Sequence, residues 1–473
     1  MESLTMTEEW KALLQLAVPK FLSTLSVFSL SLTEMIVAGH LGTSEMTAVA
    51  FSQIIFDFSI IVFSQGFNRG LNALGSQAVG AKSYHLLGRY TQMGCLGLTI
   101  MTVPMGILWW FVGDFLRLAG VSPASIVLAQ QYAHLSTLTI WPRLIFQFMT
   151  VYFDAQQIAL PTAVISITFV LLHLGINVLF VFGVPAWNWT GIGFLGMPFA
   201  MIVTSYVRLI VYLLFMMAYR QYHRASWVWN LDFLDTKFII PLIQVGLPLA
   251  LGQTFENAQL QTMALMASVV SEISLDAHNA MIGLIFFLTS PIYGLSGAGV
   301  IRIAIYLGAN KPKEAKHVAT LVATAISSFS IVTATILLLN REYVGHLFSK
   351  DAEIWTEMTQ ICTFAAAGYV ILSLFYSSMA VLVAQARALP ILLSFFTGAW
   401  IVGVPAAYFI GVSWKVGLLG IWIGMALGYG VTTAISLYAS LTANWDEEAT
   451  KAVTRSKEKE EKAKETTRLL ATP

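Results

Sequence analysis

Charged side chains are scarce in this sequence, and their scarcity excludes most classes of soluble protein. Only 11% of the 473 residues are Asp, Glu, Lys or Arg, whereas soluble domains carry about 25%. The formal net charge is only +1, so we expect no nucleic-acid partner. The two cysteines, Cys95 and Cys362, lie in different apolar runs and form neither a disulfide framework nor a zinc site.

Catalytic sequence motifs are also missing. The chain contains no HExxH, no GxSxG, no phosphate-binding P-loop and no cluster of acids facing a membrane surface. We therefore expect no enzymatic activity, no metal site and no cofactor. Because there is no nucleotide site, active transport by this chain would have to be driven by an ion gradient.

Long apolar runs dominate what is present, since 57% of the residues are hydrophobic. A helix of about 20 apolar residues crosses the ~30 Å hydrocarbon core of a bilayer. Windows of that length predict an all-α integral membrane protein with twelve spanning helices. Their predicted ranges are 12–38, 46–76, 90–113, 126–153, 161–184, 192–219, 239–270, 277–306, 317–339, 356–386, 390–411 and 416–442.

Basic residues in the loops predict the orientation of the helices. They are concentrated at one set of helix ends, which the positive-inside rule places in the cytoplasm together with both termini. These loop residues are Lys82, Arg89, Arg220, Arg224, Lys237, Lys311, Lys313, Lys316 and Arg387. The sequence leaves open whether the membrane is the plasma membrane or an internal, vacuolar-type one.

The chain repeats itself at a constant offset. The segment 155–161 (AQQIALP) recurs as 384–390 (AQARALP), 229 positions later, and Pro19 and Pro248 have the same spacing. Gly-Ala at 80–81 recurs at 308–309. We infer two homologous six-helix lobes, 1–219 and 239–442, joined by a cytoplasmic linker at 220–238. Transporters of this build hold substrate between the lobes. Residues 443–473 form a charged cytoplasmic tail, either a solvated helix or disordered.

Glu256 is the most informative single residue. It is the only charge-capable side chain in the run 246–270 and lies near mid-depth. A carboxylate there is costly, which favours an ion or substrate site. The alternative is a permanently protonated helix contact, but a glutamine would fill that role at lower cost. Gln253, Asn257 and Gln261, at steps of four, form a polar stripe beside it.

Other polar residues at depth leave alternatives open. Glu34 could bind a proton or cation, or extend to the interface at a helix end. Asp57 could line a cavity or pair with Arg143 or Arg69. We interpret three arginines in spans as extending to the interface, and His173 as a hydrogen-bonded packing residue rather than a metal ligand. The interface arginines are Arg69, Arg208 and Arg302. Tyr293 is an aromatic residue able to stack on a flat cation. The full set of substrate-cavity candidates is Gln253, Asn257, Gln261, Asp57, Asn68, Asn177, Tyr293 and Tyr376.

The motifs in this order resemble those of the multidrug and toxin extrusion (MATE) family across the whole predicted membrane region. Glu34 is followed by Gly-His-Leu-Gly at 39–42, and Gln-Ala-Val-Gly-Ala follows at 77–81. The second half has Pro248 and Glu256, then Ser-Gly-Ala-Gly-Val-Ile-Arg at 296–302 and Leu-Gly-Ala at 307–309. The resemblance implies two lobes around a central cavity.

What the resemblance implies for function is export of organic cations or other amphipathic xenobiotics and metabolites in exchange for protons or sodium ions. Glu256 and Glu34 would be the coupling carboxylates of the two lobes. The chain departs from the family where a second acid is common in the tenth helix, because Tyr376 aligns there. That loss favours protons over sodium ions as the coupling ion.

We therefore expect a monomeric proton-coupled antiporter whose partners are a small organic cation and the lipid bilayer. One alternative is a flippase for lipid-linked oligosaccharides, which would need a strongly cationic cavity. A second alternative is an intramembrane lipid transferase, which would need paired acids or histidines at a membrane surface.

Overall fold

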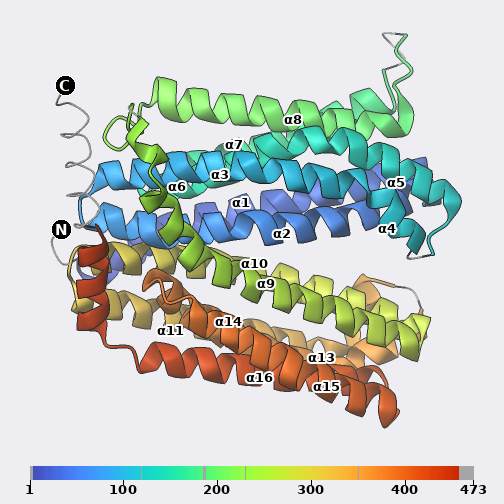
Figure 1. Cartoon of the computed structure of the whole chain (residues 1–473). Helices are drawn as coiled ribbons and strands as arrows, with labels where there is room; N and C mark the ends of the chain where they lie inside the picture. The colour runs from blue at the N-terminus through green and yellow to red at the C-terminus, as the bar shows by residue number, and fades with distance from the viewer. Residues whose placement is uncertain (1–3, 119, 185–187, 230, 350, 457–473) are drawn as a thin grey trace. The chain divides into compact units, whose positions relative to one another are not determined.

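The computed structural model describes residues 4–118, 120–184, 188–229, 231–349 and 351–456. These residues are almost entirely helical (Figure 1). The helices are α1 (Met6–Leu41), α2 (Thr43–Gly80), α3 (Tyr84–Trp110), α4 (Val112–Leu118), α5 (Pro123–Ser136), α6 (Ile140–Ala155), α7 (Leu160–Val181), α8 (Gly196–Leu213), α9 (Thr236–Val270), α10 (Glu272–Gly308), α11 (Pro312–Leu339), α12 (Arg341–Val344), α13 (Ala352–Ala384), α14 (Leu389–Phe395), α15 (Val404–Ala407) and α16 (Leu418–Leu441).

The predicted all-α membrane fold is confirmed. Eleven helices in the described part of the chain are long and apolar enough to cross a membrane. The remaining predicted span, 126–153, is present as α5 and α6, which are separated by a 3₁₀ turn at Thr137–Thr139. Pro142 explains the break, because it has no N–H to donate to the carbonyl group of Leu138 four residues earlier.

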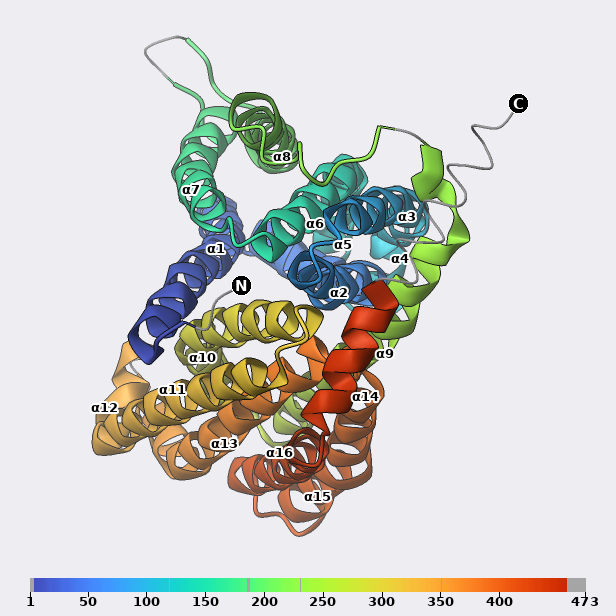
Figure 2. The same ribbon diagram turned by 90° about the vertical axis from the view of Figure 1, so that its left-hand side faces the viewer.

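Contacts between residues divide the chain into two compact units. One contains residues 22–246, and the other contains residues 1–21 and 247–456. The boundaries fall inside two helices, α1 after Phe21 and α9 after Gly246. In the second unit α13 is the most buried candidate span and packs against α10, α11 and α16; Figure 2 shows these helices end-on.

The sequence repeat has the same backbone geometry in both halves. Lys82 and Asn310, which end the Gly-Ala turns after α2 and α10, have φ values of 60° and 57°. Gln157 and Ala386, in the loops after α6 and α13, have φ values of 65° and 58°. Left-handed conformations are uncommon for residues other than glycine, so their recurrence at equivalent positions supports the inferred homology of the halves.

Small residues bring the last helices of the chain into close contact. α14 continues through a π-helical stretch at Phe396–Gly403 before α15. A Cβ atom added to Gly398 would lie 2.0 Å from Thr432 Oγ1 and 2.6 Å from the carbonyl oxygen of Gly428 on α16. Glycine is needed here because the two backbones approach too closely for any side chain.

A buried ion pair ties the start of α1 to α10. The Nε and Nη2 atoms of Arg302 donate to the two carboxylate oxygens of Glu9 at 2.7 and 2.6 Å. The Tyr306 hydroxyl donates to Glu9 Oε2 at 2.7 Å, and Glu9 and Arg302 are each 2% exposed. The prediction that Arg302 extends to the membrane interface is wrong, because hydrogen-bonded pairing with Glu9 allows the guanidinium to stay buried.

Candidate ion and substrate sites

Glu256 on α9 lies inside the second unit at the centre of a small polar cluster. The side chain is 4% exposed. Gln253, one turn earlier, donates from Nε2 to Glu256 Oε2 at 2.9 Å, and the Tyr376 hydroxyl on α13 donates to Oε1 at 3.3 Å. Tyr293 on α10 lies with its hydroxyl 3.2 Å from that of Tyr376. Three helices therefore place hydrogen-bonding groups around one carboxylate.

The cavity beside Glu256 is small and aromatic. It has a volume of about 30 Å³, which is enough for a water molecule and far too little for a drug-sized ligand. Its walls come from α9, α10, α13 and α16, and they include Phe286, Phe364, Tyr369, Trp422 and Tyr429. In this conformation the site can hold a proton or a water molecule, and an organic cation would need a wider opening.

Glu34 on α1 forms a second cluster, within the first unit. Its side chain is fully buried. Oε1 accepts a hydrogen bond from Asn177 Nδ2 at 2.8 Å and lies 2.8 Å from His173 Nε2, both on α7. The Tyr132 hydroxyl on α5 donates to Oε2 at 3.1 Å. Glu34 is thus enclosed by partners, and the alternative in which it extends to the interface is excluded.

His173 gives this cluster a proton of its own. The 2.8 Å separation of His173 Nε2 and Glu34 Oε1 requires a proton between them, carried either by the imidazole or by the carboxylic acid. The other ring nitrogen, Nδ1, lies 3.0 Å from Thr204 Oγ1 on α8. These contacts agree with the interpretation of His173 as a hydrogen-bonded packing residue, and its acidic partner lies 139 positions away in the chain.

Comparison with known proteins decides the family. The sequence model of the MatE family matches residues 19–179 and 248–409, one match in each half of the chain. This chain belongs to the MatE family. Protein DETOXIFICATION 16 of Arabidopsis thaliana is 26% identical over 466 residues, covering 96% of this chain and 92% of that protein. Multidrug and toxin extrusion protein 1 of Oryctolagus cuniculus is 23% identical over 420 residues, covering 89% and 72%.

The fold is shared with solved MATE structures. A crystal structure of the eukaryotic MATE transporter AtDTX14 superposes with a TM-score of 0.86 at 22% sequence identity, covering 95% of this chain and 99% of that one. With the family match and the eleven apolar helices of the described residues, the chain is a multi-pass membrane transporter of the MatE family. These comparisons do not support the flippase and lipid transferase alternatives.

Other residues predicted for the transporter's site lie in several places. Asn177 bonds to Glu34, and Asn257 donates to the backbone carbonyl of Gln253 at 2.8 Å. Gln261 is exposed. Asn68, on α2, is 8% exposed, and its Oδ1 has no hydrogen-bond partner in the described part of the chain. Within the polar stripe on α9, Gln253 donates a hydrogen bond to Glu256, whereas Asn257 donates to the Gln253 backbone.

Two charged residues of the first unit, Asp57 and Arg208, differ from the sequence interpretation. Asp57 is exposed, and Arg143 acts on it electrostatically without an ion pair within 4 Å among the described residues. Arg208 is only 7% exposed, and its guanidinium carbon lies 4.3 Å from the ring centroid of Phe146. The prediction that Arg208 extends to the interface is therefore wrong, because cation–π contact holds it inside the unit.

Several residues near the two carboxylates were not identified from the sequence. Tyr132 and Thr204 belong to the Glu34 cluster, and Tyr429 and Trp422 line the Glu256 cavity. The sequence contains a local pattern only for the part of the Glu34 cluster on α7, whose two residues were named above. His173 and Asn177 are four residues apart on α7, so they share a helix face in an otherwise apolar span.

Proposed function

We propose that this MatE-family transporter is a proton-coupled antiporter that exports organic cations, with Glu256 as the group that exchanges proton for substrate. The observation that carries the proposal is the environment of Glu256. It is a buried carboxylate, bonded to Gln253 and Tyr376, beside an aromatic cavity that holds no more than a water-sized particle in this conformation. A buried carboxylate of this kind is expected to be functional in a membrane protein.

The proposed exchange follows from competition for one carboxylate. Proton binding from the outside would neutralise Glu256 and favour the state that releases substrate. Loss of the proton to the cytoplasm would leave an anion that attracts the next organic cation, and aromatic walls suit a flat cationic ligand. Exchange is obligatory provided that proton and cation prefer different conformations. The Glu34–His173 pair would contribute a second site that holds a proton.

The donors around both carboxylates support protons over sodium ions. Gln253 and Tyr376 direct an N–H and an O–H at Glu256, and Asn177 and Tyr132 do the same at Glu34. A sodium ion is a hard cation, and its binding site needs several oxygen atoms that offer lone pairs rather than hydrogens. A proton needs only one carboxylate oxygen.

The test is efflux of ethidium from proteoliposomes under an imposed pH gradient or an imposed sodium gradient. We expect wild-type protein to respond to the pH gradient and Glu256→Gln to lose that response while still folding. Glu342→Gln is the matched control, because Glu342 is an exposed carboxylate on α12. Efflux driven by sodium alone would overturn the proton assignment, and wild-type efflux by Glu256→Gln would overturn the role of Glu256.

A further inference from the structure

The end of the second unit carries an open pocket that the transport mechanism does not use. It has a volume of about 520 Å³ and lies between the loop after α13 and the helical residues 445–456, here called the tail helix. The loop contributes Gln385, Ala386 and Arg387. The tail helix contributes Glu448, Thr450, Lys451, Thr454 and Arg455.

The tail helix is firmly docked on this unit. Asn444 caps its first turn, with Oδ1 accepting from the backbone N–H groups of Asp446 and Glu447 at 3.2 and 3.3 Å. Ala449 and Ala452, which both belong to this helix, are fully buried. Figure 1 shows the helix turned sharply away from the axis of α16. A docked helix presents its side chains in fixed directions, which a binding site requires.

Positive charge predominates in the pocket lining, which contains three cations, Arg387, Lys451 and Arg455, but a single carboxylate, Glu448. The carboxylates of Glu447 and Glu448 pair with Lys451 at 2.7 and 3.0 Å. This pairing holds the pKa of Glu447 below its usual range and raises that of Lys451.

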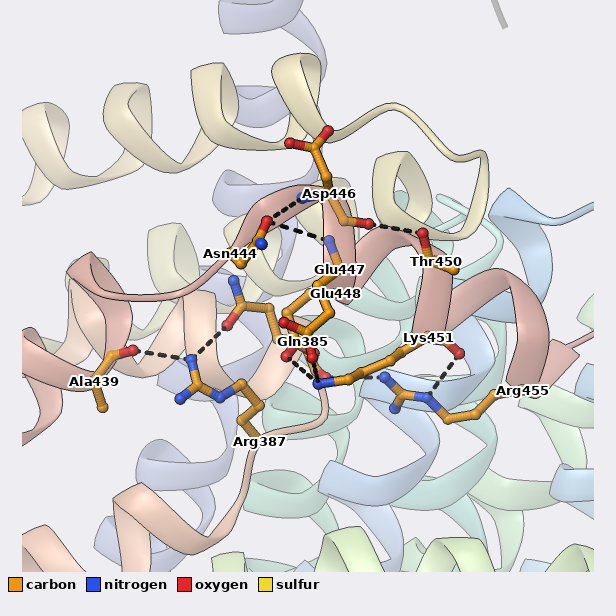
Figure 3. Close-up of polar contacts among 10 residues, drawn as sticks. All are labelled: Gln385, Arg387, Ala439, Asn444, Asp446, Glu447, Glu448, Thr450, Lys451 and Arg455. Carbon is orange, nitrogen blue, oxygen red and sulfur yellow. Dashed lines mark hydrogen bonds and ion pairs between the residues drawn. The ribbon is translucent and has the colours of Figure 1, made fainter.

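The two guanidinium groups are oriented by carbonyl oxygens. Arg387 Nη1 donates to the Ala439 carbonyl at 2.9 Å, and Arg455 Nη2 donates to the Gln385 carbonyl at 3.3 Å. Figure 3 shows both groups together with Lys451 where the loop meets the tail helix. These carbonyl contacts fix the directions of the two guanidinium groups at the edge of the pocket.

A buried donor in the same lining is unsatisfied. Gln385 is fully buried; its Oε1 accepts from Arg387, and its Nε2 has no partner among the described residues. An amide N–H buried without an acceptor costs free energy. A ligand that supplies oxygen acceptors would satisfy this donor and the arginines together, whereas a cation or an apolar ligand would satisfy neither.

We propose that this pocket binds a phosphate group, carried by an anionic lipid or by a soluble phosphate compound, and that the bound group fastens the tail helix to the α13–α14 loop. Phosphate offers several strong acceptor oxygens in the geometry that arginine recognises. Basic clusters beside the cytoplasmic ends of spanning helices are typical sites for anionic headgroups. The predicted cytoplasmic orientation places the pocket on that side.

The equivalent place in the first unit is built differently, which makes the pocket a property of the second unit. There the loop after α6 has Ile158 where this loop has Arg387. Residues from the 220–238 segment cover that end, with Tyr152 Oη 2.5 Å from Ser226 Oγ and Gln92 Nε2 donating to the Val228 carbonyl at 2.7 Å. The repeat therefore has a covered end whose loop carries Ile158 and an open end whose loop carries Arg387 at the equivalent position.

The experiment uses the full chain in phosphatidylcholine nanodiscs and measures hydrogen–deuterium exchange of residues 445–456. One arm adds inorganic phosphate, and a second replaces part of the phosphatidylcholine with phosphatidic acid. We expect saturable slowing of exchange, about tenfold, in at least one arm. Slowing by phosphatidic acid alone identifies a lipid headgroup, and slowing by inorganic phosphate identifies a soluble ligand.

Two variants and a control decide the role of the pocket. Arg387→Gln should raise the half-saturating concentration of the effective probe about tenfold, and Arg387→Lys should raise it by less because the charge remains. Lys313→Gln removes one positive charge from an exposed position in the α11 start outside the pocket and should leave binding unchanged. No slowing in either arm, or an equal loss in Lys313→Gln, would overturn the proposal.

Discussion

At the scale of single residues, partner choice determines what each buried charge does. Glu9, Glu34 and Glu256 are all nearly inaccessible, and Glu9 forms an ion pair with Arg302. Glu34 lies 2.8 Å from His173 Nε2, and Glu256 is bonded to Gln253 and Tyr376. In the proposed mechanism the first carboxylate contributes to stability and the other two exchange protons.

The first prediction concerns the Glu9–Arg302 pair. Glu9→Gln leaves the buried Arg302 guanidinium without its counter-charge, which typically costs about 3–5 kcal/mol. We expect the apparent Tm of the purified protein to fall by about 5 °C or more. Glu8→Gln is the control, because Glu8 is the neighbouring residue and is exposed. Equal Tm values for the two variants would contradict a stabilising pair.

At the scale of elements, helix contacts depend on residues that a hydropathy profile does not distinguish. The π-helical stretch 396–403 packs on α16 through Gly398, and α5 and α6 are offset by the turn before Pro142. π-Helical segments and broken helices are frequent where helices carry function. In this unit the same helix α16 also provides two walls of the Glu256 cavity, Trp422 and Tyr429.

The second prediction tests this glycine contact. Gly398→Ala would place a methyl group 2.0 Å from Thr432 Oγ1, so the helices must separate, at a cost of about 1–3 kcal/mol. Thermal unfolding measures the loss. Gly430→Ala on α16 is the control, since nothing lies within 4 Å of the added Cβ atom; alanine there should leave stability unchanged or raise it by about 0.5–1 kcal/mol. Unchanged stability of Gly398→Ala would show that the contact adapts.

At the scale of the whole molecule, the proposed exchange links proton and substrate through a change of conformation. The Glu256 cavity of about 30 Å³ is too small for an organic cation, so in the proposed mechanism substrate binding would favour a different arrangement. A ligand shifts such an equilibrium only by its difference in affinity for the two states. Proton uptake and cation binding are then expected to weaken each other reciprocally.

The third prediction follows from this linkage. When pH falls, Glu256 takes up its proton and loses the charge that attracts the cation, so the apparent Kd for ethidium should rise. Fluorescence anisotropy on purified protein should show a rise of up to tenfold per pH unit over the range in which Glu256 is protonated. Glu256→Gln should flatten this dependence and Glu342→Gln should keep it. A Kd independent of pH in the wild type would contradict competition at a carboxylate.

Much of the fold was predictable because its signals are local. Mean hydropathy over about 20 residues locates the spans, and the offset of 228–229 positions between repeated segments gives the two halves. Left-handed residues at Lys82 and Asn310, and at Gln157 and Ala386, confirm that the repeated segments fold alike. Glu256 was identified because an isolated acid in an apolar run is costly wherever the helix packs.

The partners of those residues were decided only by the tertiary structure. Glu34 meets Tyr132 and His173, which lie 98 and 139 positions away, and Arg302 meets Glu9, 293 positions away. Hydropathy treats each helix separately, so it cannot state which face of one helix meets which face of another. The sequence by itself determined the spans, the repeat and the isolated carboxylate. Helix packing determined which side chains each buried acid contacts, because that depends on groups brought within about 3 Å across helices.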